Sequence, residues 1–180
     1  MKTIAFLLEF GFEEIETIVP VDILRRLGFN VIIAGAKDII EGSHGLKLKP
    51  DIMIKDIDCN KLDAVVLPGG MPGSINLAKN PNVLKILKEM EAKNALIAAI
   101  CAAPIALAAA GLITGIKITA HPSVREQLKG ANYTGNLTEH DKNIITGKGP
   151  GASFEFANRI ASTLGKSSEV KQLLRDMFIY

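Results

Sequence analysis

The feature that most constrains the fold is an alternation along the chain between apolar runs of strand length and amphipathic or alanine-rich runs of helix length. Strands are expected at residues 3–8, 30–36, 64–67, 95–100, 117–120 and 144–146. Helices are expected at residues 13–28, 81–93, 103–111, 123–130, 154–164 and 168–178. Strands that are apolar throughout and alternate with helices are typical of a parallel sheet covered on both faces. The sequence therefore predicts an α/β sandwich with a mostly parallel central sheet.

Two segments depart from this regular pattern. Pro20 stands inside the first expected helix, where a proline removes a hydrogen bond and is expected to kink or break the helix. Residues 39–56 alternate more loosely between apolar and polar side chains, and they predict a β-excursion or a hairpin.

The composition indicates one domain that folds without covalent or metal cross-links. Hydrophobic residues make up 48% of the 180 residues, which is enough for a sizeable core, so residues 1–180 are expected to form a single domain. Cys59 and Cys101 are the two cysteines, and they form neither a CxxC pair nor a metal-ligand cluster. We therefore expect no metal and no disulfide framework, and a reducing, cytoplasmic location.

The charges and the apolar runs argue against nucleic acid and membrane partners. The 21 basic and 19 acidic residues are interspersed, so there is neither a basic stripe nor a polybasic patch. The apolar run at the N-terminus meets Glu9 early and lacks a small-residue cleavage site, which favours a first strand over a signal peptide. The longest apolar window, residues 95–113, is interrupted by Pro104 and Gly111 and is a poor candidate to span a bilayer.

Polar and flexible residues follow the expected strands where functional sites form in such folds. Sites in parallel α/β sheets lie at the carboxyl ends of the strands. Four candidates come directly after strands: the acidic run at 13–16, the glycines Gly69 and Gly70, Cys101, and His121. We expect these groups to meet at one edge of the sheet.

Cys101 stands where a buried strand gives way to a helix. Such a junction can hold a nucleophile in a sharp, exposed turn, and the small neighbours Ala102 and Ala103 leave room for one. The N–H groups of the following helix, which has Pro104 in its first turn, would favour the thiolate. The alternative interpretation is a small, buried and inert core cysteine.

Two other features would give such a thiol its chemistry. The backbone N–H groups of Gly69 and Gly70 and that of Ala102 are placed to form an oxyanion hole. One carboxyl of the acidic run Glu13, Glu14 and Glu16, once desolvated, would keep its proton near neutral pH and donate it to the sulfur or to a substrate oxygen. The alternative for these glutamates is a simple charge complement at the start of a helix.

Three other candidates show weaker signals of a functional role. The loop GKGPGAS at residues 147–153 lacks the glycine fingerprints of nucleotide sites, and a tight turn beside the active site is expected instead. His140 is expected in a solvated turn, and Cys59 is expected to lack an activating environment.

The segments EEIETIVPVDILRR, DAVVLPGG, ALIAAICAAP, ITAHP and GKGPGASFEFA, in this order and spacing, resemble the ThiJ/PfpI superfamily and within it the DJ-one branch. The resemblance covers nearly the whole chain. It implies a flavodoxin-like α/β sandwich, similar to class I glutamine amidotransferases, and a homodimer.

The resemblance also implies roles for individual residues. Cys101 matches the nucleophilic, easily oxidised cysteine, Glu16 the protonated glutamate beside it, and Gly70 and Ala102 the backbone donors of the oxyanion hole. His121 matches a histidine near the cysteine, although no partner in the sequence would make it a relay.

This chain departs from the pattern at three positions. Ala102 stands where the protease-like branch has a histidine, which argues against a Cys-His dyad. Ala103 replaces a glycine or serine, and His44 falls where animal relatives often have an arginine.

The resemblance implies a cofactor-independent enzyme that acts on small α-oxoaldehydes, converting methylglyoxal to lactate as glyoxalase III does, and that also removes early glycation adducts as a deglycase. Two alternatives stay open. One is a redox-responsive stress protein or chaperone controlled by Cys101, and the other is a peptidase or amidotransferase-like hydrolase.

Overall fold

The protein is built around a seven-stranded sheet in the order β10-β11-β7-β6-β1-β2-β5. The computed structural model describes residues 1–179. Every neighbouring pair in this sheet is parallel except β10 and β11, which form an antiparallel arm at one edge. The strands are β1 (Thr3–Leu8), β2 (Asn30–Gly35), β5 (Ile52–Met53), β6 (Ala64–Leu67), β7 (Leu96–Ile100), β10 (Thr138–Asp141) and β11 (Ile144–Gly147).

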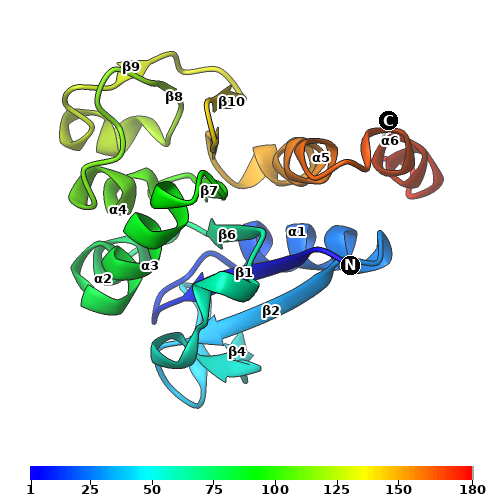
Figure 1. The fold of residues 1–180 in the computed structure, drawn as a ribbon, viewed down its shortest axis with the longest axis horizontal. Coiled ribbons are helices and arrows are strands. Elements are labelled where there is room, and N and C mark those ends of the chain that lie inside the picture. Colours follow the sequence, from blue (N-terminus) through cyan, green and yellow to red (C-terminus); the bar gives the residue numbers. More distant parts are fainter. Residues whose placement is uncertain (180) are drawn as a thin grey trace.

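Helices cover both faces of the sheet, with α2, α3 and α4 on one side and α1, α5 and α6 on the other (Figure 1). Strand β7 shows why a central strand must be apolar throughout: Ile97 and Ala99 belong to the core under α3 and α4, whereas Ala98 and Ile100 belong to the core under α1 and α5. The helices are α1 (Glu14–Arg26), α2 (Gly73–Lys79), α3 (Pro81–Ala92), α4 (Pro104–Ala109), α5 (Ser153–Thr163) and α6 (Ser167–Asp176). The predicted flavodoxin-like α/β sandwich is confirmed.

Pro20 was expected to kink or break the first helix, and the prediction of a break is wrong. Helix α1 runs without interruption from Glu14 to Arg26 with Pro20 buried inside it. A proline at this position removes only the bond that would end on the carbonyl of Glu16. Packing of α1 against α5 and the sheet compensates for the lost bond.

The segment at residues 39–56 contains the predicted hairpin and also an edge strand. Strands β3 (Ile40–Glu41) and β4 (Lys47–Leu48) pair antiparallel outside the main sheet. The chain then returns as β5, which pairs parallel with β2 and ends the sheet. The tip of the β3–β4 hairpin lies beside Phe12, at the carboxyl end of β1.

The region after α4 differs from the prediction. Residues 117–120 were expected to form a strand of the central sheet, but β8 (Lys117–Ile118) pairs only with β9 (Asn132–Tyr133) in a separate two-stranded sheet. A 3₁₀ helix at Pro122–Gln127 replaces the expected short helix. Helix α2 and the antiparallel strand β10 were not predicted, because β10 is largely polar and has no strand signal.

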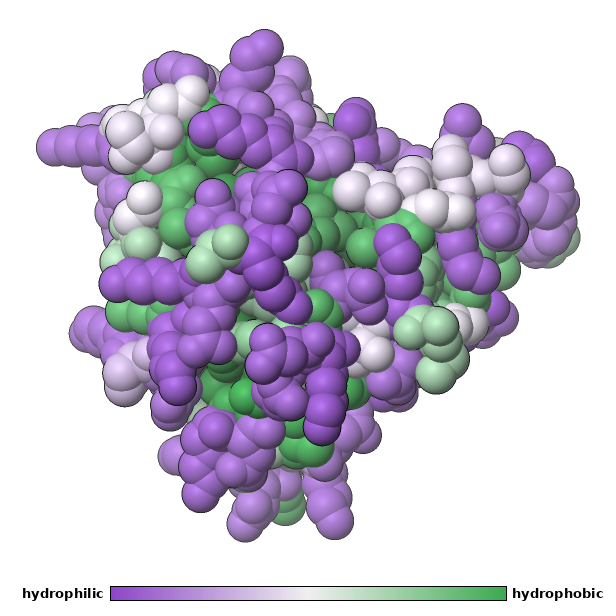
Figure 2. Space-filling model, viewed as in Figure 1, coloured by the Kyte–Doolittle hydropathy of each residue, from purple (hydrophilic) through white to green (hydrophobic). Residues whose placement is uncertain are grey.

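The surface in Figure 2 is mostly hydrophilic, and hydrophobic residues show between the polar ones rather than as one broad face. In the part of the chain that the structure describes, none of the helices has the length and apolar character needed to cross a bilayer.

Phe156 offers a direct test of the core between α5 and the sheet. Its side chain is fully buried, and a Cβ on Gly147 would lie 3.2 Å from its Cδ2 atom. Phe156→Ala should lower the free energy of unfolding by about 3–5 kcal/mol through lost burial and the cavity left behind. Phe178→Ala, at a side chain that is 94% exposed, should change it little. Urea denaturation of the two variants measures both effects, and equal losses would contradict the assignment of Phe156 to the core.

Candidate active site

Cys101 occupies a sharp turn between β7 and α4. Its φ is 63°, in the left-handed region that side chains rarely adopt. The turn is held from two sides, because the Cys101 N–H donates to the carbonyl of Gly147 at 2.8 Å and the Cys101 carbonyl accepts from His121 N–H at 2.8 Å. Ala102 and Ala103 are buried, whereas Cys101 is partly exposed. This geometry is the sharp, partly exposed turn that the sequence predicts for Cys101.

Gly69 and Gly70 let the backbone after β6 approach this turn. A Cβ on Gly69 would lie 2.5 Å from Glu16 Oε2 and 2.6 Å from the Cβ of Cys101. Gly70 has a φ of 90°, and a Cβ there would collide with the backbone of Gly11 and Glu13. Any larger residue at either position would push apart the groups that meet here.

The sulfur of Cys101 receives two backbone donors and faces one carboxyl. The N–H groups of Ala102 and Gly70 and the carboxyl of Glu16 lie close enough to the Cys101 sulfur to change its pKa: the N–H groups lower it and Glu16 raises it. The predicted oxyanion-hole donors and the predicted acid are thus brought together at one atom. Helix α4 begins at Pro104. The N–H group near the sulfur therefore belongs to Ala102 in the turn and not to a residue of the helix.

Glu16 is the acid of the three glutamates that reaches Cys101. It has no exposed surface, and its Oε2 accepts from Gly69 N–H at 2.8 Å. Its Oε1 is buried and has no hydrogen-bond partner among residues 1–179. Burial raises the pKa of Glu16 to about 7; hydrogen bonds from Cys101 and Gly69 oppose the rise, and the charge of Glu13 adds to it.

The thiol pKa does not shift in the expected direction. Burial, the charge of Glu16 and the hydrogen bond with Glu16 raise the pKa of Cys101 to about 12, against the opposing N–H groups of Ala102 and Gly70. The prediction of an acidic thiol is therefore wrong when Glu16 is ionised. The two groups titrate as a pair that loses one proton near neutral pH and holds the second far above it. Within the pair, the N–H groups of Ala102 and Gly70 favour a charge on sulfur, whereas the N–H of Gly69 favours a charge on the Glu16 carboxyl.

Glu13 and Glu14 point elsewhere. The N–H of Glu13 donates to the carbonyl of Gly69 at 2.9 Å, but its carboxyl accepts from Ser43 Oγ at 3.2 Å. The carboxyl of Glu14 accepts from the backbone of His44 at 2.7 Å. The sequence left the choice among these acids open until the resemblance selected Glu16, and the geometry agrees with that choice.

His121 contributes its backbone to the site, and its ring is exposed. Nδ1 lies 2.8 Å from Ser123 Oγ and accepts from Ser123 N–H at 3.3 Å, so the ring caps its own 3₁₀ turn. Within residues 1–179 its side chain forms no hydrogen bond with Cys101 or Glu16. The sequence predicts that His121 directly follows a strand of the central sheet. In the structure, the bond from its N–H to the Cys101 carbonyl holds it beside the site instead.

The remaining sequence candidates take separate places. The loop at residues 147–153 lies beside the site as expected, because the carbonyl of Gly147 holds Cys101. Cys59 is buried, and burial together with Glu89 raises its pKa to about 11, so it lacks an activating environment.

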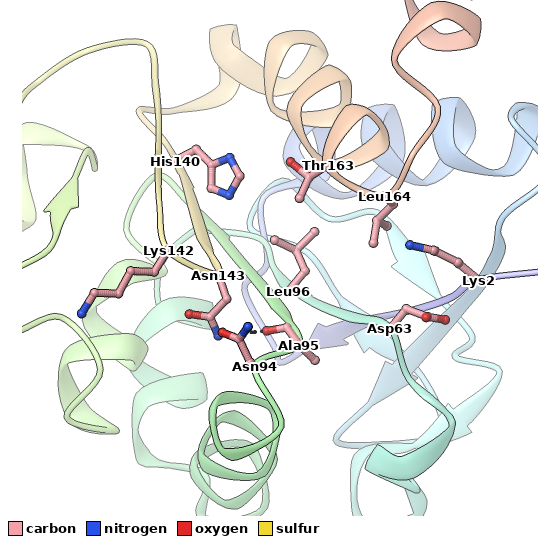
Figure 3. Close-up of a pocket in the computed structure, with 10 residues that line it drawn as sticks. All are labelled: Lys2, Asp63, Asn94, Ala95, Leu96, His140, Lys142, Asn143, Thr163 and Leu164. Carbon is pink, nitrogen blue, oxygen red and sulfur yellow. Dashed lines mark hydrogen bonds between the residues drawn. The ribbon is translucent and has the colours of Figure 1, made fainter.

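His140 is not in a solvated turn, as the sequence suggested, but on β10, with an exposed side chain. It lines a cavity of about 350 Å³ together with Lys2, Asp63 and Asn143, which precede β1, β6 and β11 (Figure 3). This cavity therefore lies at the amino ends of the strands, whereas Cys101 and Gly69 follow the carboxyl ends.

Fold and site together define a class of α/β proteins with a cysteine on a strand-to-helix turn, a buried acid beside it and two backbone donors at its sulfur. The model of the DJ-1/PfpI family matches residues 2–163, and the chain belongs to this family. The resemblance found in the sequence is confirmed.

Named relatives cover nearly the same length. The Parkinson disease protein 7 homolog of Danio rerio is 39% identical, over 91% of this chain and 89% of that protein. The glutathione-independent glyoxalase DJR-1.2 of Caenorhabditis elegans is 36% identical, over 92% and 89%. A protein of Pyrococcus abyssi named as a deglycase is 28% identical, over 85% and 93%. The crystal structure of Drosophila melanogaster DJ-1beta superposes with a TM-score of 0.94 at 35% identity, covering 98% of this chain and 97% of that one.

The burial of Glu16 gives the protein a specific dependence of stability on pH. Its pKa is 4.5 in an ordinary environment and about 7 here, so the folded protein binds this proton more tightly than the unfolded chain. This contribution is fully present below the ordinary pKa, and it is lost as pH rises through the folded pKa. The loss amounts to roughly 3 kcal/mol. Glu16→Gln should remove this loss, as measured by urea denaturation across that pH range.

Glu14→Gln is the matched control, because the pKa of Glu14 is shifted in the opposite direction from that of Glu16. Although burial raises the pKa of Glu14, hydrogen bonds from His44, including its backbone N–H, outweigh that effect and lower it. The stability that Glu14 contributes is therefore present at neutral pH and lost as pH falls. If Glu16→Gln kept the full wild-type decline between acidic and neutral pH, Glu16 would not be the buried acid described.

Proposed function

We propose that this protein is a cofactor-independent cysteine enzyme that converts methylglyoxal and similar α-oxoaldehydes to α-hydroxy acids. The observation that carries the proposal is the buried, protonatable carboxyl of Glu16 beside the Cys101 sulfur, with the N–H groups of Gly70 and Ala102 on the same atom. An aldehyde that adds to this sulfur places its oxygen near two backbone donors and its carbon near an acid that can gain and lose a proton at neutral pH.

The reaction begins when the Cys101 thiolate forms a bond to the aldehyde carbon. The carbonyl electron pair moves to the oxygen, which Glu16 protonates, giving a hemithioacetal. The Glu16 carboxylate then removes a proton from the former aldehyde carbon, and the electron pair of that C–H bond moves toward the ketone oxygen to give an enediolate. Glu16 returns this proton to the second carbon, and the hydroxyl proton of the sulfur-bearing carbon passes to the neighbouring oxygen, which gives an α-hydroxy thioester. Water then adds to the thioester carbonyl and releases lactate and the thiol. The net change is the addition of one water to methylglyoxal.

The names of relatives support this choice. Two of them, from Caenorhabditis elegans and Pyrococcus abyssi, are named as a glyoxalase and a deglycase. Deglycation starts from a sugar-derived carbonyl adduct and requires the same nucleophile and proton carrier. The homodimer and the cytoplasmic location stay predictions; Ile15 and Ile18, both exposed on α1, favour a partner on that face.

Cys101→Ala should abolish lactate formation from methylglyoxal, because no other group here can form the carbon–sulfur bond. Helix content should be unchanged, since the alanine is smaller and leaves the backbone bonds to Gly147 and His121 intact. Cys59→Ala is the matched control and should retain near wild-type turnover, since Cys59 is buried away from the site. Lactate formation by Cys101→Ala within a fewfold of wild type would exclude the proposed nucleophile.

A second candidate function is redox sensing, which the partial exposure of Cys101 beside an acid favours. A hydrolase of the Cys-His type is less favoured, because the ring of His121 bonds to Ser123 and not to the thiol.

Mild peroxide should oxidise Cys101 before Cys59. Burial and a nearby glutamate raise the pKa of both thiols, but Cys101 is partly exposed and has the N–H groups of Ala102 and Gly70 to stabilise a charged oxidised sulfur, whereas Cys59 is buried. With no second cysteine nearby in sequence, the expected product is a sulfinate, which adds two oxygens to the Cys101 peptide. Peptide mass mapping decides the order, and modification that falls first on Cys59 would contradict it.

A further inference from the structure

The tip of the β3–β4 hairpin, residues 42–46, is attached to the start of α1 by backbone and side-chain bonds. Ser43 N–H donates to the carbonyl of Phe12 at 2.8 Å. Glu14 Oε1 accepts from the N–H groups of His44 at 2.7 Å and Leu46 at 3.3 Å. Gly42 is packed so closely against the Glu14 carboxyl that a Cβ would collide with it. The hairpin tip and the first turn of α1 therefore form one packed unit.

The ring of His44 lies over two carboxyls at this tip. Nδ1 is 3.1 Å from Glu14 Oε2 and 3.5 Å from Glu13 Oε2. The imidazole is 72% exposed, whereas the side chains of Glu13 and Glu14 are 14% and 15% exposed. A proton from solvent thus reaches the ring directly, and its charge acts on two acids that are largely covered.

The ionisable groups that face His44 are these two acids from α1. On its own hairpin, Glu41 and Lys47 pair with each other at 3.6 Å. The hydrogen bond with Glu14 and the charge of Glu13 raise the pKa of His44. Three possible metal ligands lie within 4.8 Å of one another here: a carboxyl oxygen each from Glu13 and Glu14 and a ring nitrogen of His44. A chelator is therefore needed in any titration of this cluster.

Glu13 connects this unit to the candidate active site through a single residue, Gly69. The Glu13 N–H donates to the Gly69 carbonyl at 2.9 Å, and the Gly69 N–H donates to Glu16 Oε2 at 2.8 Å. Glu13 is the N-cap residue of α1, and Glu16 lies in the first turn of the same helix. The charge of Glu13 favours the protonated form of Glu16. A change in charge next to Glu13 is therefore felt at Glu16.

We propose that His44 is a positioning residue that acts on the Cys101–Glu16 pair through Glu13, and so makes proton binding at the pair depend on the charge state of the hairpin tip. The protonated ring offsets the charge of Glu13, and Glu16 then releases its proton more readily. When the ring is neutral, Glu13 is no longer offset and Glu16 retains its proton to higher pH. The tip thereby extends the pH range over which Glu16 can act as an acid. Only the proton-transfer role of Glu16 rests on the proposed function.

Two substitutions separate the charge from the shape of the ring. His44→Gln is neutral at every pH, and His44→Lys is charged across the range of interest. The probe is the rate of Cys101 alkylation by iodoacetamide against pH, in a Cys59→Ala background with excess EDTA. The step in this rate–pH profile that is absent from the Glu16→Gln variant is the titration of Glu16. We expect its midpoint to lie higher in His44→Gln than in His44→Lys by about half a pH unit. Wild type should follow His44→Lys at low pH and His44→Gln at high pH.

His140→Gln is the matched control, because it removes a histidine at the opposite edge of the sheet and should leave the midpoint unchanged. Equal midpoints in His44→Gln and His44→Lys, with folding verified by circular dichroism, would overturn the proposal. An equal shift in His140→Gln would overturn it as well, because the effect would then follow net charge alone. Alkylation does not require turnover, so absence of lactate formation would count against the proposed function and not against this coupling.

Discussion

The contact on which the rest of this structure depends is that of the Glu16 carboxyl with the N–H of Gly69 and the side chain of Cys101. It joins the start of α1 to the ends of β6 and β7, which are neighbouring strands of the sheet. The contact is possible because Gly69 has no Cβ; any side chain there would occupy the space that the carboxyl and the cysteine share. The parallel sheet brings the three segments to one edge, and the glycine sets how closely they approach.

Burial of the Glu16 carboxyl in this contact disfavours its charged form, and the same burial gives the carboxyl its proton-transfer chemistry. A carboxylate without water is unfavourable, so Glu16 holds its proton to about neutral pH. The same burial and the neighbouring acid make the thiol reluctant to ionise by itself. Proton transfer within the pair keeps the total charge constant, and the N–H groups of Ala102 and Gly70 stabilise the charge when it lies on sulfur. A site built this way needs no histidine beside the cysteine, which is consistent with Ala102 at that position.

The surroundings of the pair are arranged in layers of increasing exposure. Glu16 is fully buried, Glu13 and Glu14 are mostly covered, and His44 is open to solvent. A short hairpin outside the main sheet supplies the outer layer, and the first turn of α1 supplies the middle one. In our proposal, this arrangement lets a proton equilibrium at the surface influence a buried one over a few residues. The match to the DJ-1/PfpI family over residues 2–163 includes this hairpin.

The sequence by itself determined the parallel sheet, most of its strands and helices, and the small set of residues that could carry chemistry. It did so because apolar runs such as residues 95–100 can only be buried on both sides, and because glycines and a cysteine directly follow such runs. Local pattern could not decide which of three adjacent glutamates reaches the thiol, since that depends on how α1 lies against Gly69. The local pattern predicted that His121 follows a central strand, but a backbone bond to Cys101 places it. It also predicted that Pro20 disturbs the first helix and that the thiol pKa is low, whereas the helix is continuous and the thiol pKa is raised. Each of these depends on burial and on contacts between distant segments, and only the tertiary structure decides those.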